Sequence, residues 1–175
     1  MDGFSEATAV FDAAGIAEIC RFRAAVWSAT GLLRPEAFGC EGWRDPVDEH
    51  AFHWVVRHVA SGLLAAAGRL SLHRGLDQVH QADEYLRYGL AFSGPVAAPD
   101  RVVVAPEFQG AGLGALIVDL QDRFARACGA QVAVRQASPS MVRIIKRRGW
   151  NLVGPASDDP RFPGAAFTVA YRSLA

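Results

Sequence analysis

The feature that most constrains this chain is a glycine-rich turn between a short apolar run and a strongly amphipathic segment. The run Val-Val-Val at 102–104 is typical of a buried strand, and glycines follow at positions 110, 112 and 114. From residue 113 to 127 the apolar residues share one face and charged residues the other, which predicts a helix. Glycines allow a tight turn and a close approach to a ligand, and the first N–H groups of a helix have no partners inside it. The segment therefore predicts an anion-binding turn.

Three other interpretations of this turn are weaker. A Walker loop needs lysine and a hydroxyl residue after the last glycine, and Ala115 follows Gly114. In a dinucleotide fingerprint the glycines follow the strand at once and an acid comes about 20 residues later. Here four residues, 106–109, intervene, and Arg135 and Gln136 stand where the acid is expected. The third interpretation is a tight turn with no ligand.

Residues 104–115 read Val-Ala-Pro-Glu-Phe-Gln-Gly-Ala-Gly-Leu-Gly-Ala. This segment resembles the acetyl-CoA-binding motif of the GNAT N-acetyltransferases, V-x-P-x-[FY]-[QR]-x-x-G-x-G-[AGT]. A second family signature, N-x-x-A-x-x-[LF]-Y-x-x-x-G-[FW], is similar to residues 138–150 through Ile144, Gly149 and Trp150. The resemblance covers nearly the whole chain, with residues 74–95 as the main excess.

The order of elements predicts one mixed sheet. Hydrophobic patterns indicate strands at 7–11, 52–59, 63–72, 102–104, 132–134, 150–153 and 167–171, and helices at 13–27, 113–127 and 139–148. This order favours an α/β or α+β domain wound around one sheet. At 175 residues we expect a single domain, 1–175, with an insertion at about 74–95. The resemblance implies a mostly antiparallel sheet of six to seven strands, with helices on both faces and one splayed strand pair.

The resemblance also implies site residues. Main-chain groups of 102–104 would bind the pantetheine arm of CoA, the turn would bind the pyrophosphate, and the amide of Val104 would donate to the thioester oxygen as charge builds there. The expected cofactor-binding residues are Val102, Val103, Val104, Gln109, Gly110, Ala111, Gly112, Leu113, Gly114, Ala115 and Ser138. Acetyl-CoA is the expected co-substrate, and no metal is expected.

The chain departs from the family at the acid and the base. Ile145 stands where many relatives have a proton-donating tyrosine, and Ala98 where many have a glutamate base. Because side chains alternate along a strand, Ala98, Asp100, Val102 and Val104 are expected to share one face. Asp100 then lies about 7 Å beyond Ala98 and becomes the predicted base, acting through one water. The alternative is a turn aspartate after Pro99.

Composition excludes several classes of protein. Eighteen basic residues balance eighteen acidic ones, so the excess positive charge of a general nucleic-acid binder is missing. No apolar stretch approaches the roughly 20 residues of a spanning helix, and the start of the chain is acidic rather than signal-like. Three scattered cysteines, Cys20, Cys40 and Cys128, predict neither disulfides nor zinc. We therefore expect a cytoplasmic protein that binds neither nucleic acid nor membrane.

The predicted function is direct transfer of an acetyl group from acetyl-CoA to a primary amine of a small molecule or peptide. The alternative is an acyl-CoA-binding regulatory or sensor domain with weak catalysis. Residues 31–50 carry five acidic and two basic residues, which predicts a pocket wall that favours a cationic amine. Pairing of Asp48 with Arg69 or His53 is expected to be structural. The sequence leaves open the amine, the acid and base, the pathway and whether the protein forms a homodimer.

Overall fold

The computed structural model describes residues 3–34, 36 and 38–174, which form a seven-stranded sheet with the order β1-β2-β3-β4-β5-β7-β6. The strands are β1 (Thr8–Val10), β2 (Phe52–Arg57), β3 (Leu64–His73), β4 (Val96–Val104), β5 (Val132–Ala137), β6 (Asn151–Pro155) and β7 (Thr168–Ser173). The helices are α1 (Ala13–Ser28), α2 (Asp83–Leu86), α3 (Leu113–Ala127) and α4 (Pro139–Lys146). Short 3-10 turns span Pro46–Glu49, Leu76–Gln78 and Pro106–Phe108. All neighbouring strands are antiparallel except β4 and β5, so the expected mixed, mostly antiparallel sheet is confirmed.

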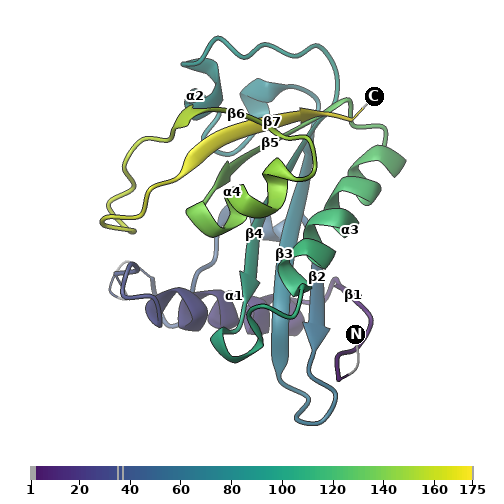
Figure 1. Ribbon diagram of the computed structural model, residues 1–175, viewed down its shortest axis with the longest axis vertical. Coiled ribbons are helices and arrows are strands. Elements are labelled where there is room, and N and C mark those ends of the chain that lie inside the picture. Colours follow the sequence, from purple (N-terminus) through teal and green to yellow (C-terminus); the bar gives the residue numbers. More distant parts are fainter. Residues whose placement is uncertain (1–2, 35, 37, 175) are drawn as a thin grey trace.

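Helices cover both faces of this sheet (Figure 1). Helices α3 and α4 lie on one face, over a core that includes Leu113, Ile117, Ile145 and Trp150. Helix α1 crosses the opposite face, where Ile19 and Val26 pack against β2, β3 and β4. Each helix buries one apolar stripe against the sheet, which is the arrangement that its hydrophobic periodicity predicts.

The ends of α3 and α4 follow the predicted capping signals. The hydroxyl oxygen of Ser138 accepts a hydrogen bond from the N–H of Met141 at 3.4 Å, and Pro139 occupies the first helical position. Beyond the end of α3, Gly129 has φ +78°, a left-handed conformation that glycine adopts without strain. Both helices therefore begin and end where the sequence places them, within one or two residues.

Strand β4 is six residues longer than the predicted run at 102–104, because Pro99 does not interrupt it. Arg69 pairs with Asp100 and Ala67 with Val103, so Gly68 alone faces two residues of β4. This is a β-bulge, and Arg101 within it has φ +53°. The bulge reverses the alternation of side chains. Val102 and Val104 pack under α3, away from the face of Ala98, so the prediction that all four residues share one face is wrong.

Strands β4 and β5 separate soon after they meet. Their parallel pairing consists of Val96 with Val132 and Ala97 with Ala133. Beyond these pairs both strands continue, β4 toward the glycine turn and β5 toward Ser138, without bonding to each other. The splayed strand pair implied by the resemblance is therefore present, with its apex at Ala97 and Ala133.

The segment 74–95 is part of the core rather than a loose loop. Leu76, Val79 and Tyr85 are buried in a cluster with Val96 and Val134 of the splayed strands. Removing this segment would expose that cluster to water. The segment expected as an insertion therefore contributes buried side chains to the core.

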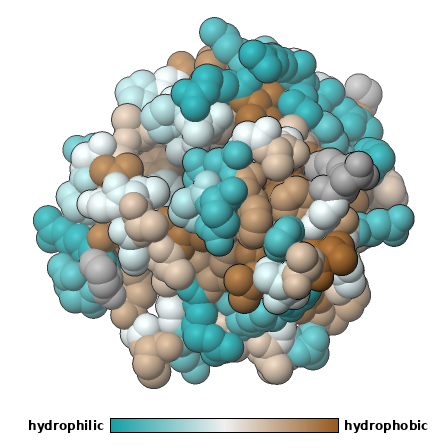
Figure 2. All heavy atoms as spheres, turned by 60° about the horizontal axis from the view of Figure 1, so that its bottom comes forward, coloured by the Kyte–Doolittle hydropathy of each residue, from teal (hydrophilic) through white to brown (hydrophobic). Residues whose placement is uncertain are grey.

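The end of the molecule that carries the β2–β3 hairpin and the glycine turn shows mixed hydrophilic and hydrophobic surface (Figure 2). Its exposed apolar side chains include Val59 and Leu63 at the hairpin tip. Among the residues that the structure describes, none of the helices is long and apolar enough to cross a membrane.

Candidate active site

The glycine turn presents a group of unbonded backbone N–H groups at the start of α3. Gly110 and Gly112 have φ +85° and +82°, so the turn depends on conformations that other residues rarely adopt. Among the described residues, nothing accepts a hydrogen bond from the N–H groups of Gly110, Gly112, Leu113, Gly114 or Ala115. These five donors, together with the helix dipole, form a cradle suited to a pyrophosphate.

Two predicted members of the cradle are already engaged. The N–H of Gln109 donates to the carbonyl of Pro106 at 3.3 Å, and the N–H of Ala111 donates to that of Phe108 at 3.4 Å. Both bonds are long and hold the turn in shape. Gln109 and Ala111 therefore position the cradle, while their neighbours supply its free donors.

The main chain of Val104 faces the opening between the splayed strands. The N–H of Ala105 donates to the carbonyl of Ala65 on β3 at 2.9 Å. Because successive residues of a strand direct their N–H and C=O groups to opposite sides, the amide of Val104 points away from β3 and toward β5. At this position β5 has already diverged, so the amide of Val104 faces the opening between the two strands. Its role as donor to the thioester oxygen stays a prediction.

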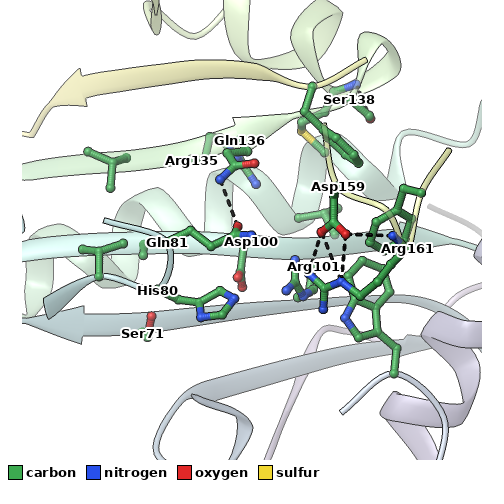
Figure 3. Close-up of a pocket in the computed structure, with 18 of the residues that line it drawn as sticks. Ser71, His80, Gln81, Asp100, Arg101, Arg135, Gln136, Ser138, Asp159 and Arg161 are labelled. Atoms are coloured by element: carbon green, nitrogen blue, oxygen red, sulfur yellow. Dashed lines mark hydrogen bonds and ion pairs between the residues drawn. The ribbon is translucent and has the colours of Figure 1, made fainter. Parts of the chain in front are cut away.

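A cavity of about 90 Å³ lies at the splay of β4 and β5 (Figure 3). Residues from several separate segments line it: Trp27; Trp43; Ser71; Val79, His80, Gln81 and Tyr85; Ala98, Asp100, Arg101 and Val102; Val134, Arg135, Gln136 and Ser138; Met141; and Asp159, Arg161, Phe162 and Phe167. The predicted site residues Asp100, Val102 and Ser138 thus meet at one cavity. The cradle residues lie farther along the chain, at the open end of the splay.

A buried network of ion pairs reaches this cavity through Asp100 and Arg101. Arg69 binds Asp48 at 2.9 Å, Asp45 at 3.1 Å and Asp100 at 2.6 Å, and its side chain is fully buried. Arg23 of α1 binds the same Asp48 at 2.7 Å. Burial disfavours charge on these carboxylates, but the guanidinium groups outweigh it and hold the pKa of Asp45 and Asp48 below the usual range. The expected structural pairing of Asp48 with Arg69 is confirmed.

Asp100 belongs to this network, and its geometry argues against the predicted role as base. Its carboxylate accepts two hydrogen bonds from Arg69, at 2.8 and 2.6 Å. Burial alone would raise the pKa of Asp100, but the charge and hydrogen bonds of Arg69 hold it far below its usual value. A carboxylate held in this way accepts a proton poorly near neutral pH. Asp100 is also a strand residue rather than a turn residue, so the alternative prediction is wrong as well.

Other titratable groups line the cavity. Burial lowers the pKa of His80, so its imidazole is neutral at pH 7. Burial raises the pKa of Tyr85, which makes its hydroxyl a hydrogen-bond donor but a weak acid. At the positions where many relatives of the resembled family have tyrosine and glutamate, Ile145 and Ala98 are buried in the core. Neither of these two side chains can accept or donate a proton.

The segment 158–167 supplies a part of the site that sequence reasoning missed. Asp159 and Arg161 form a bidentate pair, with the shortest distance 2.6 Å, at the mouth of the cavity (Figure 3). Phe162 packs on Trp43 with ring centroids 4.7 Å apart, which joins this segment to the loop after α1. The only signal in the sequence was a polar, proline-containing stretch between two strands, which is typical of any loop.

The predicted acidic wall of residues 31–50 is largely neutralised. Asp45 binds Arg101 at 2.7 Å as well as Arg69, and Glu41 and Glu49 both lie within 4 Å of Arg44. The net charge counted along the segment does not describe the cavity, where both signs meet. The reason given for a cationic acceptor therefore does not hold.

Within the described ranges, the side chains of His, Cys, Asp and Glu form no group of three or more that could hold a metal ion. The three cysteines are unpaired, and Cys20 alone is buried.

Comparison with known proteins supports the fold. No family model matches the chain, and no curated protein matches it in sequence. Among solved structures, it is similar to FeeM, an N-acyl amino acid synthase from uncultured soil microbes, with TM-score 0.72 and 11% identity over 98% of this chain and 91% of the other. The acyl-homoserine-lactone (AHL) synthase LasI has TM-score 0.70 and 14% identity over 98% and 91%. Arylalkylamine N-acetyltransferase 2 from Aedes aegypti has TM-score 0.64 and 13% identity over 98% and 100%. The chain therefore has the GNAT fold.

Proposed function

We propose that this protein is an N-acyltransferase that moves an acyl group from a CoA thioester to the primary amine of a small molecule in a ternary complex. The observation that carries the proposal is the splay of β4 and β5, which opens between the free amides of the cradle and a charged cavity. The motif residues of the turn fit a CoA pyrophosphate, and the solved structures of this fold include acyl-transferring enzymes.

In this proposal the acyl-CoA donor follows a path set by the direction of β4. Its pyrophosphate binds the amides of residues 110–115, and the pantetheine arm lies along 102–104 as an added strand. The thioester then reaches the bulge at Arg101, beside the cavity. Acetyl-CoA is the simplest donor consistent with this path and is the first to assay.

The reaction needs a neutral amine at the thioester carbonyl. The amine nitrogen bonds to the carbonyl carbon, a β4 amide stabilises the oxygen as it gains charge, and the sulfur leaves with the electrons of the C–S bond. One proton of the amine must also leave. His80 lines the cavity and is neutral at pH 7, so we assign it as the proton acceptor in place of Asp100. The thiolate of CoA is a good leaving group and needs little help from an acid.

The acceptor is proposed to be a zwitterion. The cavity carries partly exposed groups of both signs, Arg101 and Arg161 with Asp100 and Asp159. A carboxylate beside the primary amine would bind a guanidinium through paired hydrogen bonds, while the ammonium form of the amine is attracted by an aspartate. The similarity in fold to FeeM, an N-acyl amino acid synthase, supports an amino-acid-like acceptor.

We expect amino acids or their derivatives to be acetylated or acylated with higher kcat/KM than the matched amines that lack the carboxylate. The difference should be at least tenfold, because a charge-assisted hydrogen bond contributes about 1.5–3 kcal/mol. Pairs such as phenylalanine and phenethylamine, measured by thiol release, give this ratio directly. A preference for amines without a carboxylate would contradict the zwitterion proposal while leaving N-acyl transfer intact.

The function itself is tested by binding and turnover together. CoA should raise the melting temperature and NADPH should not, since a ligand at 100 times its Kd stabilises by about 2.7 kcal/mol. Thiol release with an amine present then demonstrates acyl transfer.

The second candidate function is a binding or sensor domain. It is favoured by the buried Ile145 and by Asp100, which is bound to Arg69. Tight binding of acyl-CoA without turnover would establish it. Failure to bind any CoA species would overturn both.

A further inference from the structure

Arg135 of β5 is a buried cation without a paired anion. Only 2% of its surface is exposed. Its Nε and Nη1 atoms are buried and bond to no described residue. Its guanidinium carbon lies over the ring of Trp150, 5.3 Å from the ring centre. Burial lowers the pKa of Arg135 to about 10, so the side chain remains charged at pH 7. Burial of a charge without an ionic partner is unfavourable, which makes Arg135 a candidate for ligand binding.

The acidic groups nearest to Arg135 are committed elsewhere. Asp122 of α3 pairs with Arg172 at 2.6 Å, and Asp100 is held by Arg69 at 2.6 Å. Both attract Arg135 through space, but neither lies within ion-pair distance of it. The guanidinium therefore keeps unused donors inside the protein.

Arg135 also lies at the splay. It lines the cavity, and it stands two residues beyond Ala133, the last residue of β5 that pairs with β4. Figure 3 places it beside Gln136 on this strand. By alternation, Arg135 shares the face of Ala133 and Ala137, which pack under α3 and α4. Its side chain is thus on the face of the sheet from which the cradle at the start of α3 would deliver the donor.

The direction of the donor decides which part of it meets Arg135. The cradle lies at the open end of the splay, and the pantetheine arm runs from there toward the apex at Ala97. The acyl group is at the far end of that arm, so it is the part of the donor nearest the apex. Both Ala98, next to the apex, and Arg135 line the cavity into which the acyl group would extend.

We propose that Arg135 binds the end of the acyl group, and that the preferred donor is the CoA thioester of a dicarboxylic acid, with its free carboxylate on this guanidinium. The inference rests on the proposed acyl-transfer function and specifies its donor. A planar guanidinium matches a carboxylate through two parallel hydrogen bonds. The free carboxylate supplies the negative charge that Arg135 lacks in the protein.

The test compares two donors of equal chain length. Succinyl-CoA ends in a carboxylate and butyryl-CoA in a methyl group. With wild-type protein and one fixed amine, we expect kcat/KM for succinyl-CoA to exceed that for butyryl-CoA at least tenfold. In Arg135→Met, which keeps an unbranched apolar side chain without the charge, the preference should disappear or reverse. Arg123→Met, an exposed position on α3, serves as the matched control and should keep the wild-type preference.

The donor comparison does not depend on the variant. If Arg135→Met does not fold, the methyl ester of succinyl-CoA is assayed with wild-type protein, and it should lose the advantage of succinyl-CoA. Wild-type protein that uses butyryl-CoA as well as succinyl-CoA would overturn the inference and leave the proposed function standing. Absence of binding and turnover with every thioester would overturn both. A preference that survives in Arg135→Met would show that another residue binds the carboxylate and would also overturn the inference.

Discussion

We expect Gly112→Val to abolish CoA binding while the protein remains folded. Gly112 precedes α3 with φ +82°, and a Cβ atom added there would meet no atom within 4 Å. That open space lies among the unbonded amides where the pyrophosphate is proposed to bind. A valine would fill it and would also strain the left-handed backbone by about 1–2 kcal/mol. Isothermal titration should show at least a 100-fold loss of CoA affinity, about 2.8 kcal/mol.

Gly129→Val is the matched control for this variant. Gly129 lies beyond the opposite end of the same helix, with φ +78° and the same open space around an added Cβ. The two variants should lose similar stability, because they impose the same backbone strain, yet Gly129→Val should bind CoA with wild-type affinity. Equal CoA affinity in the two variants would contradict the assignment of the cradle.

The cradle could be predicted from sequence because its residues are neighbours in the chain. Spacing alone placed the strand, the three glycines and the amphipathic helix, and the same local signals placed α1, the β2–β3 hairpin and α4. The helices depend on contacts between residues three or four positions apart, and the hairpin follows from two apolar runs joined by a short turn that contains glycine. The length of β4 was harder to predict, because a proline such as Pro99 normally interrupts a strand. It is tolerated here because β4 has no neighbour on its β5 side beyond Ala97.

The polar cavity could not be predicted in the same way. The network joins Arg23, Asp48, Arg69 and Asp100, which come from four elements spread over 78 positions, and only Asp48 with Arg69 was anticipated. The bulge at Arg101 had no sequence signal, yet it directs both Asp100 and Arg101 toward this network. A simple alternation along β4 therefore placed Val102 and Val104 on the wrong face. It also gave no sign that Asp100 would be paired with Arg69 rather than act as a base.

We expect Arg69→Met to cost about 3–5 kcal/mol of folding free energy, which is the usual cost of breaking a buried ion pair from one side. Arg69 is fully buried and contacts Asp45, Asp48 and Asp100. Removing its charge leaves these three carboxylates with less compensation than the interior requires. Arg57→Met is the control on the neighbouring strand. Arg57 binds Glu18 at 2.6 Å, but both side chains are about 40% exposed, and exposed pairs contribute about 0–1 kcal/mol.

The loss in Arg69→Met should depend on pH in a defined direction. Asp45, Asp48 and Asp100 have pKa values held below those of the unfolded chain, chiefly because neighbouring arginines outweigh burial. Carboxylates of this kind stabilise the fold at pH values above their pKa in the unfolded chain, which is near 3.9. The stabilisation is lost as the pH falls toward and through their lower pKa in the folded protein. The difference in unfolding free energy between wild type and Arg69→Met should therefore be largest at pH 5–8 and shrink below about pH 4. Urea titrations from pH 3 to 7 measure it. A difference that stays constant over this range would mean that Arg69 stabilises the fold by packing rather than by its charge.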